Sequence, residues 1–407
     1  MSNIAILGLG VVGGGTADLL TQNSRQIAEQ AGEEVVIKYI LDKRQFPDSP
    51  YKDKVINDYD VILKDPSVAV VAELMGGAHP AYEFSLQALQ AGKHVVTSNK
   101  EVVSKFGDEL LAAAKEAGVS YRFEASTGGG IPILSTLTRD LAVNEIEEIS
   151  GILNGTTNYI LTRMYSDGAS YTDALEEAKQ SGYAEANPID DIGGLDVCRK
   201  IAILAATTTG KLVTCDRIHT EGITAIRATD VDTAHKSGYT VKLLGRYLRE
   251  KQECFMVVAP FLVPLDSPLA NVAGVKNAIL VRGNFVGDVM FYGNGAGAYA
   301  TASSVVADIV AALWGSPSGK VWKKNSEDMP TDFNLFACRH YLSFIGCDEY
   351  NFRIVFGQVE FLQSNDGECT FLTPVLTERE VADGLARLAK VSGGASLASH
   401  LRVYEHQ

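Results

Sequence analysis

One stretch near the middle of the chain gathers side chains that bind charged groups and move protons. Residues 182–200 read GYAEANPIDDIGGLDVCRK, in which four acids precede Lys200. The acids are Glu185, Asp190, Asp191 and Asp196. A solvated loop before a helix would also collect acids, because a helix N-terminus favours negative charge. The stretch alone therefore leaves open a solvated loop and a binding site.

The helix expected over residues 195–206 (LDVCRKIAILAA) places Asp196 and Lys200 on one face, because they are four residues apart. An exposed ion pair at this spacing would contribute only a few tenths of a kcal/mol to stability. Apolar residues surround Lys200 in this helix, so we expect the lysine to line a cleft rather than face bulk water.

The N-terminus carries a second candidate site, a glycine-rich turn between a strand and a helix. An apolar strand over residues 4–7 leads into GLGVVG at 8–13. In this pattern the first glycine makes the turn, the second lets backbone approach a pyrophosphate, and the third allows close helix–strand packing. The helix N-terminus favours the phosphates. We therefore predict a dinucleotide site formed by Gly8, Gly10, Val11, Val12 and Gly13.

The choice between NAD and NADP depends on the end of the second expected strand, residues 34–41. Asp42 stands where an acid would bind the ribose hydroxyls. Lys43 and Arg44 follow and could hold a 2′-phosphate instead. The two cations favour NADP slightly, and the sequence leaves both cofactors open.

Further strands (68–74 and 94–97) alternate with helices (81–91, and one ending near 118). This alternation predicts an α/β fold with a Rossmann-type, doubly wound parallel sheet. Ligands of such sheets lie at the carboxyl ends of the strands, where Ser98 and Lys100 are placed. Lys100 could instead be a solvated residue at a helix start.

Composition excludes several other classes of protein. The net charge of −14 and the absence of a basic stripe argue against nucleic-acid binding. No apolar run is long enough to span a bilayer, and the N-terminus lacks the pattern of a signal peptide. The six cysteines show no C-x-x-C spacing, which is typical of reduced thiols in a cytoplasmic protein and argues against structural zinc.

Six segments together resemble homoserine dehydrogenases, in the order of that family and over about residues 1–315. They are GLGVVG at 8–13, SNK at 98–100, EASTGGGIPI at 124–133, GILNGTTNYI at 151–160, the acidic stretch at 182–200 and GNGAGAYATAS at 293–303. The resemblance implies reversible hydride transfer between L-homoserine and NAD(P)+, which gives L-aspartate 4-semialdehyde in threonine, methionine and isoleucine biosynthesis.

The resemblance also implies roles for individual residues. Lys200 would be the acid/base, Asp196 would position substrate and lysine, and Lys100 would lie near the reacting oxygen. Glu185 and Asp191 would bind the polar groups of the substrate. Gly182 and Gly297 would approach the cofactor. The family binds a monovalent cation, Na+ or K+, which here implies Glu124 with backbone carbonyls of Thr127, Gly129 and Ile131.

The expected domains follow the same order along the chain. Residues 1–140, with a returning helix at 299–315, form the NAD(P)-binding Rossmann domain, and 141–298 form an α+β substrate-binding and dimerisation domain. Residues 316–332 are a polar linker. Residues 333–407 show a βαββαβ order that resembles a small ACT domain, although Gly346-Cys347-Asp348-Glu349 replaces its usual Asp-x-Pro-Gly turn.

Partners and alternatives complete the expectations. We expect a homodimer or homotetramer, no nucleic acid, no membrane, and an amino-acid effector such as threonine. One alternative is a non-catalytic NAD(P)-sensing regulator, and another is a dehydrogenase of a different small amino or hydroxy acid. Absorbance of the reduced nicotinamide on mixing protein, substrate and cofactor would separate these alternatives.

Overall fold

The structure, a computed structural model, describes residues 1–315, 319–346, 349–365, 367–391 and 395–405. Its contacts divide the chain into two compact units. Three segments make the first unit: Met1–Ile146, Ala202–Thr214 and Gly283–Ser326. Three others make the second: Glu147–Ile201, Cys215–Arg282 and Glu327–Gln407. Cys347 and Asp348 of the expected ACT turn lie outside the described residues.

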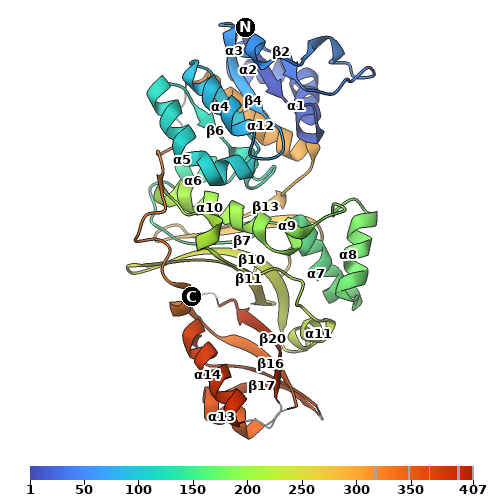
Figure 1. Cartoon of the computed structure of the whole chain (residues 1–407), viewed down its shortest axis with the longest axis vertical. Coiled ribbons are helices and arrows are strands. Elements are labelled where there is room, and N and C mark those ends of the chain that lie inside the picture. The colour runs from blue at the N-terminus through green and yellow to red at the C-terminus, as the bar shows by residue number, and fades with distance from the viewer. Residues whose placement is uncertain (316–318, 347–348, 366, 392–394, 406–407) are drawn as a thin grey trace. The chain divides into compact units, whose positions relative to one another are not determined.

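The first unit contains a six-stranded parallel sheet with the strand order β3-β2-β1-β4-β5-β6. Figure 1 labels β2, β4 and β6 of this sheet among the helices of the first unit. The strands are β1 (Ser2–Leu7), β2 (Val35–Leu41), β3 (Val55–Ile56), β4 (Val68–Glu73), β5 (His94–Thr97) and β6 (Tyr121–Arg122). Strands β2 and β3 lie on one side of β1, and strands β4, β5 and β6 lie on the other side. The expected α/β fold with a Rossmann-type sheet is confirmed.

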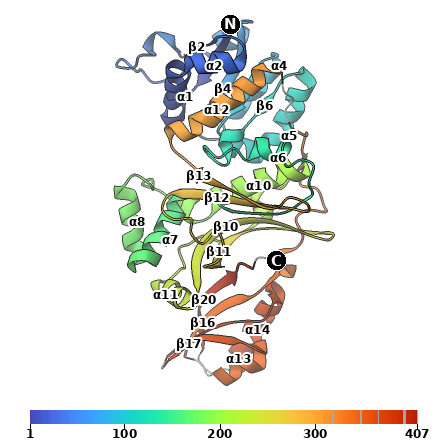
Figure 2. The same cartoon turned by 180° about the vertical axis from the view of Figure 1, so that it is seen from behind.

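Helices cover this sheet because their apolar residues face its buried strands. The helices that contact its strands are α1 (Val11–Gln22), α2 (Ser24–Ala31), α4 (Ala81–Gln90), α5 (Lys100–Ala117) and α12 (Ala298–Leu313). The first unit also contains α3 (Tyr59–Lys64) and α6 (Leu134–Thr138). Helix α12 comes from far along the chain and packs with α1 on a shared apolar core that includes Ile6, Ala17 and Ile309. Figure 2 shows this helix lying among the N-terminal elements.

The second unit has a long, mostly antiparallel sheet with the order β12-β7-β10-β11-β20-β16-β18-β17. Its strands are β7 (Ile146–Ile152), β10 (Tyr239–Glu250), β11 (Glu253–Pro264), β12 (Lys276–Gly283), β16 (His340–Ile345), β17 (Glu360–Asn365), β18 (Glu368–Leu372) and β20 (Ser396–Val403). The short β9 (His219–Thr220) also pairs with β11. The helices are α7 (Gly155–Asp167), α8 (Tyr171–Gln180), α9 (Ile189–Ile192), α11 (Ala228–Lys236), α13 (Glu349–Phe356) and α14 (Glu378–Val391), and α10 (Leu195–Thr209) is divided between the units.

The last segment of the chain shares its sheet and its core with the middle segment. Elements β16, α13, β17, β18, α14 and β20 follow in the expected βαββαβ order. Strand β20 pairs in parallel with β11, with Phe261 opposite Arg402. One apolar cluster joins Phe255 of β11 to Phe336 and Tyr404. Removal of the tail would therefore expose apolar surface of the middle segment.

Residues from the expected linker pack on the first unit. Trp322 is buried and its ring lies edge-on to Phe123 at 5.3 Å between ring centroids. Strand β14 (Lys323–Lys324) pairs with β8 (Lys211–Leu212). Residues 316–318 of this segment lie outside the described residues.

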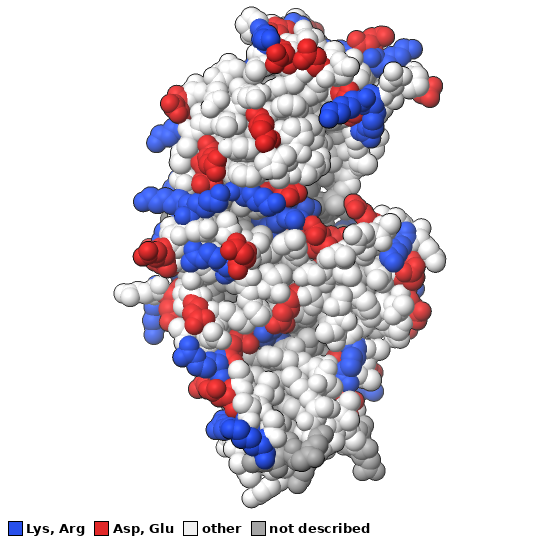
Figure 3. All heavy atoms as spheres, in the orientation of Figure 1, with Lys and Arg blue, Asp and Glu red and all other residues white. Residues whose placement is uncertain are grey.

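Charged side chains of both signs lie on the surface of the chain. On the face drawn in Figure 3, several Lys and Arg side chains adjoin one another across the middle, and acidic side chains are scattered over the rest of the face. Among the described residues, no helix combines the length and apolar character needed to cross a bilayer.

Candidate active site

Lys200 is a buried side chain held by two acceptors within the second unit. Its Nζ lies 2.6 Å from the carbonyl oxygen of Leu153 and 2.8 Å from Asp196 Oδ2. Asp196 is itself buried, so the expected pair on one face of α10 is an enclosed ion pair rather than a surface one. The carboxylate therefore fixes where the ammonium points.

Asn154 connects this ion pair to a third acid of the sequence motif. Its amide Nδ2 donates to Asp196 Oδ2 at 2.9 Å and to Asp191 Oδ1 at 2.8 Å. Its Oδ1 accepts from the backbone N–H of Thr157 and caps the start of α7. The hydroxyl of Thr156 lies 3.3 Å from Asp191 Oδ2. The NGTT turn thus holds two carboxylates at one place, a role that the sequence reading did not assign to Asn154.

The four acids of the motif have different environments. Asp190 pairs with Arg199 at 2.7 Å, which makes it part of the scaffold. Glu185 is exposed, and no described residue forms a side-chain hydrogen bond with it. Gly182 is exposed as well and has a φ of 73°, which a residue with a side chain rarely adopts. Glu185 is thus accessible to a charged ligand.

In the first unit, the glycine-rich turn has the geometry that a dinucleotide requires. Gly8 has a φ of 95°. A Cβ on Gly13 would lie 1.9 Å from the carbonyl oxygen of Gly8, so only glycine lets α1 start this close to β1. A Cβ on Gly10 would meet no heavy atom within 4 Å, which leaves open space above the turn. These residues fit a pyrophosphate at the N-terminus of α1.

A surface pocket of about 600 Å³ adjoins the end of β2. Its charged lining residues are Asp42, Lys43, Arg44, Lys52 and Asp58. Asp42 accepts from the N–H of Leu9 at 2.9 Å and from Arg44 at 2.8 and 3.0 Å. Hydrogen bonds from Arg44 hold the pKa of Asp42 well below its usual range. Both carboxylate oxygens therefore have partners before any ribose binds.

A buried acid that the sequence reading missed connects the loops after β4 and β5. Glu73 Oε2 accepts from the hydroxyl of Thr97 at 2.6 Å, and Oε1 accepts from the N–H of Met75 at 2.8 Å. Thr97 in turn accepts from the N–H of Asn99, which caps α5 directly before Lys100. Ser98 lies in the same loop. Glu73 therefore fixes backbone at the carboxyl edge of the sheet.

Burial raises the pKa of Glu73 to about 7, and the phenol of buried Tyr121 is close enough to respond to its charge. The native state therefore holds this proton more tightly than the unfolded chain does. Stability from this group is fully present below the unfolded pKa and is lost as pH rises through about 7. In the unmodified protein, ionisation of Glu73 should lower the free energy of unfolding by roughly 2–3 kcal/mol between about pH 5 and about pH 8. We expect Glu73→Gln to remove this decrease.

Urea unfolding followed by tryptophan fluorescence measures this effect, because both tryptophans, Trp314 and Trp322, belong to the first unit. Asp308, whose pKa burial also raises to about 7, is present in both proteins and cancels in the comparison. A stability difference between variant and unmodified protein that stays constant with pH would contradict the assignment.

The glycine-rich turn at 124–133 is organised by the Glu124 side chain. Its two oxygens accept the backbone N–H groups of Ile133, Leu134 and Ser135 at 2.6–2.8 Å, so the carboxylate caps α6. The carbonyl of Gly129 accepts from the hydroxyl of Ser304 on α12 at 2.6 Å. Gly297 has a φ of 113° and is the N-cap residue of α12.

Comparison with known proteins identifies the family. The model for the homoserine dehydrogenase NAD-binding domain matches residues 8–124, and the homoserine dehydrogenase model matches residues 132–310. A homoserine dehydrogenase from Synechocystis is 44% identical over 343 residues, which cover 83% of this chain and 77% of that protein. The chain belongs to the homoserine dehydrogenase family.

Solved structures of homoserine dehydrogenases agree with this membership. The enzyme from Thiobacillus denitrificans superimposes with a TM-score of 0.89 at 33% identity, over 99% of this chain and 98% of that chain. A hyperthermophilic archaeal homoserine dehydrogenase mutant in complex with NADPH gives a TM-score of 0.67 at 29% identity, over 78% of this chain and 98% of that one. The first likeness includes the tail, which the homoserine dehydrogenase family models do not cover.

The structure brings together part of the residue set expected for a homoserine dehydrogenase. Asp191, Asp196 and Lys200 form one network through Asn154 in the second unit. The glycine turn at 8–13, the residues at the end of β2 and Lys100 belong to the first unit, as do Glu124 and Gly297, whereas Gly182 belongs to the second. The assignment of functional roles to these residues stays a prediction.

Proposed function

We propose that this chain catalyses the reversible, NAD(P)-dependent interconversion of L-homoserine and L-aspartate 4-semialdehyde. The observation that carries the proposal is the buried Lys200–Asp196 pair, fixed by Asn154 beside Asp191. An amino-acid substrate brings an ammonium, which needs carboxylates, and a reacting hydroxyl, which needs a proton acceptor. The network supplies both functions in one short region of the chain.

Each residue of the network has a distinct task. The Lys200 ammonium donates a proton to the alkoxide that develops as the aldehyde is reduced, and its neutral amine accepts that proton in the reverse direction. Asp196 and the Leu153 carbonyl orient Nζ, so the lysine loses little freedom in the transition state. Asp191 and the exposed Glu185 bind the polar groups of the substrate.

The cofactor residues support the hydride chemistry of this reaction. The turn at Gly8, Gly10 and Gly13 suits the pyrophosphate, and the N-termini of α1 and α12 favour negative charge. When bound, the nicotinamide ring supplies or accepts the hydride. Lys100, just after the Glu73-supported loop, would stabilise negative charge on the reacting oxygen.

A spectrophotometric assay of the reduced nicotinamide tests this function. We expect turnover with L-homoserine and much less with serine, threonine or malate. Turnover of a different acid with none of homoserine would favour the other dehydrogenase class. Cofactor binding without turnover of any of the four substrates would favour the sensor.

We further propose that NADP is preferred, because Lys43, Arg44 and Lys52 contribute three cations to the pocket beside β2. Hydrogen bonds between charged groups contribute about 1.5–3 kcal/mol, so Lys43→Ala/Arg44→Ala should raise KM for NADP+ at least about tenfold. KM for NAD+ should stay nearly constant. Steady-state kinetics with both cofactors provides the measurement.

The matched control is Arg25→Ala/Lys115→Ala, which removes the same charge from exposed positions of the first unit that do not line the pocket. This control should leave both KM values unchanged. A clear NAD+ preference of the unmodified chain, or equal effects of the two double variants, would contradict the proposal.

We also propose that a monovalent cation, Na+ or K+, binds at the 124–131 turn. Backbone carbonyls of Thr127, Gly129 and Ile131 offer the hard oxygen atoms that such ions prefer. The Glu124 carboxylate already accepts three N–H groups, so its main role in this site would be to hold the turn. Assay in sodium or potassium chloride against choline chloride tests the ion, and equal rates in all three salts would argue against it.

For assembly, we propose a homodimer or homotetramer built through residues 141–298, and an effector role for the tail. Strands β10 and β11 are buried on both faces within the chain, whereas Phe285, Met290 and Tyr292 are exposed. The exposed side chains, near or within β13 (Gly287–Asn294), favour a contact around that strand. Light scattering of the unmodified protein and of Tyr292→Asp tests the assembly. The same measurement with and without threonine tests whether this effector changes the assembly. A monomeric unmodified protein would contradict the proposed assembly.

A further inference from the structure

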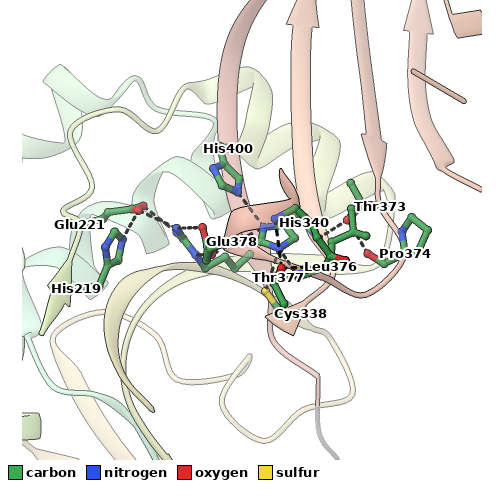
Figure 4. A network of polar contacts seen from close by, with 12 residues as sticks. His219, Glu221, Cys338, His340, Thr373, Pro374, Leu376, Thr377, Glu378 and His400 are labelled. Atoms are coloured by element: carbon green, nitrogen blue, oxygen red, sulfur yellow. Dashed lines mark hydrogen bonds and ion pairs between the residues drawn. The ribbon is translucent and has the colours of Figure 1, made fainter. Parts of the chain in front are cut away.

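Three side chains with metal-binding atoms meet in the second unit, outside the network described above. Among the described residues, Cys338, His340 and Glu378 place one ligand atom each within 4.8 Å of one another. Cys338 ends β15 (Ala337–Cys338), His340 begins β16 and Glu378 begins α14 (Figure 4). His340 is fully buried, and Cys338 and Glu378 are nearly so.

The spacing of the first two ligands suits one tetrahedral ion. Cys338 Sγ lies 3.7 Å from His340 Nε2. Zinc binds sulfur at about 2.3 Å and nitrogen at about 2.1 Å, so two such ligands at a tetrahedral angle lie about 3.6 Å apart. The two side chains could therefore share an ion without movement of the backbone.

The other atoms around His340 suit a metal ligand as well. Its Nδ1 lies 2.9 Å from His400 Nε2. Figure 4 draws this contact between the two rings as a dashed line. A partner on the second ring nitrogen commonly orients a metal-binding histidine. The carbonyl oxygen of Leu376, in β19 (Leu376–Thr377), lies 3.0 Å from Nε2 and is a fourth donor atom at the site, after one sulfur, one nitrogen and one carboxylate oxygen.

Charge in this buried region also favours a cation. Arg402 pairs with Glu378 at 2.5 Å and with Glu221 at 2.9 Å, so one guanidinium faces two carboxylates. His219 also lies near, 2.6 Å from Glu221. Counted over Arg402, Glu378 and the partly exposed Glu221, one negative charge is left over. A divalent ion bound by a thiolate adds one net positive charge and balances it, which matters because buried charge is costly when uncompensated.

We propose that Cys338, His340 and Glu378 form a binding site for one zinc ion, with the carbonyl of Leu376 as fourth ligand. In the absence of the ion, His340 donates from Nε2 to Leu376 and accepts at Nδ1 from His400. On binding, the His340 proton moves to Nδ1 and is donated to His400, while His400 carries its own proton on Nδ1. The Cys338 thiol loses its proton to solvent, so one proton leaves for each ion bound.

This site would join elements that are distant in sequence. Zinc would connect β15 and β16 to the start of α14, near the point where β20 joins β11. The ion would therefore stabilise the tail rather than take part in hydride transfer. The proposal is independent of the proposed function, because neither Lys200 nor the nucleotide residues belong to this cluster.

Cobalt titration of the full, reduced chain tests the site, since Co²⁺ replaces zinc and reports its ligands by colour. We expect one equivalent to give a sulfur-to-cobalt charge-transfer band and the visible bands of tetrahedral cobalt, both abolished by excess zinc. Cys338→Ser should lose the charge-transfer band, because it removes the sulfur ligand. His340→Gln should lose the bands of tetrahedral cobalt, because it removes one of the four ligands. Cys369→Ser, which changes another buried cysteine of the tail, should keep both.

Two further measurements test the zinc site even if the variants fold poorly. Zinc should raise the melting temperature of the unmodified chain and of Cys369→Ser, and X-ray absorption of the zinc-loaded unmodified chain should show one sulfur with nitrogen or oxygen ligands. A zinc shell without sulfur, or no cobalt–thiolate band in the unmodified chain, would overturn the proposal. Equal bands in Cys338→Ser and the unmodified chain would do the same.

Discussion

Replacement of Lys200 by alanine should lower kcat for homoserine oxidation at least about 10²-fold, the usual contribution of general acid–base catalysis. The side chain is buried and hydrogen-bonded to Asp196 and to the carbonyl of Leu153, so alanine removes a proton donor that these contacts hold in position. The affinity for NADP+ should barely change, because the glycine turn at 8–13 and the residues at the end of β2 belong to the first unit. Steady-state kinetics and fluorescence titration of the cofactor provide the two measurements.

The chain offers a matched control for this variant. Asp232 and Lys236 form the same four-residue pair on α11, at 2.6 Å and with both side chains exposed. Lys236→Ala should leave kcat within about twofold, since exposed pairs contribute little. If Lys200→Ala retains near-normal turnover while circular dichroism shows it folded, another residue must be the acid/base and the proposed mechanism is incorrect.

The fold of the first unit was predictable because its signals are local. Apolar strands such as 68–74 and 94–97 end within a residue of β4 and β5. The glycine turn and the alternation with helices then restrict the sheet to a parallel, doubly wound one. The pairing of β20 with β11 was not predictable in this way, since the partner of a strand depends on contacts between residues more than a hundred positions apart.

The candidate site was predictable where spacing within one element decides geometry. Asp196 and Lys200 are one helical turn apart, and the structure makes them an ion pair. Asn154 was missed, because its bridge to Asp191 and Asp196 exists only after tertiary folding. The sequence does contain a signal for Glu73, which is an acidic residue within an apolar strand. A carboxylate in the apolar run VAVVAEL is rarely placed without a partner, and here it has two.

The second large effect is expected at Arg402, which is almost fully buried where the tail joins the middle segment. Its guanidinium contacts Glu378 at 2.5 and 3.1 Å and Glu221 at 2.9 Å. Arg402→Met keeps much of the side-chain volume but leaves the buried Glu378 carboxylate without its counter-ion. Loss of one partner of a buried pair costs about 3–5 kcal/mol, so the free energy of unfolding of the second unit should fall by that amount.

Hydrogen–deuterium exchange of peptides spanning 340–345 and 396–403 is the appropriate measurement, because both tryptophans lie in the first unit and report little on the second. Arg379→Met is the control, since Arg379 forms an exposed, 3.7 Å ion pair with Asp332 and should change stability by less than about 1 kcal/mol. Faster exchange should be confined to the second unit in Arg402→Met. If exchange in β16 and β20 is unchanged, the ion pairs do not hold the tail to the middle sheet, and the shared apolar cluster around Phe255, Phe336 and Tyr404 must be sufficient for that junction.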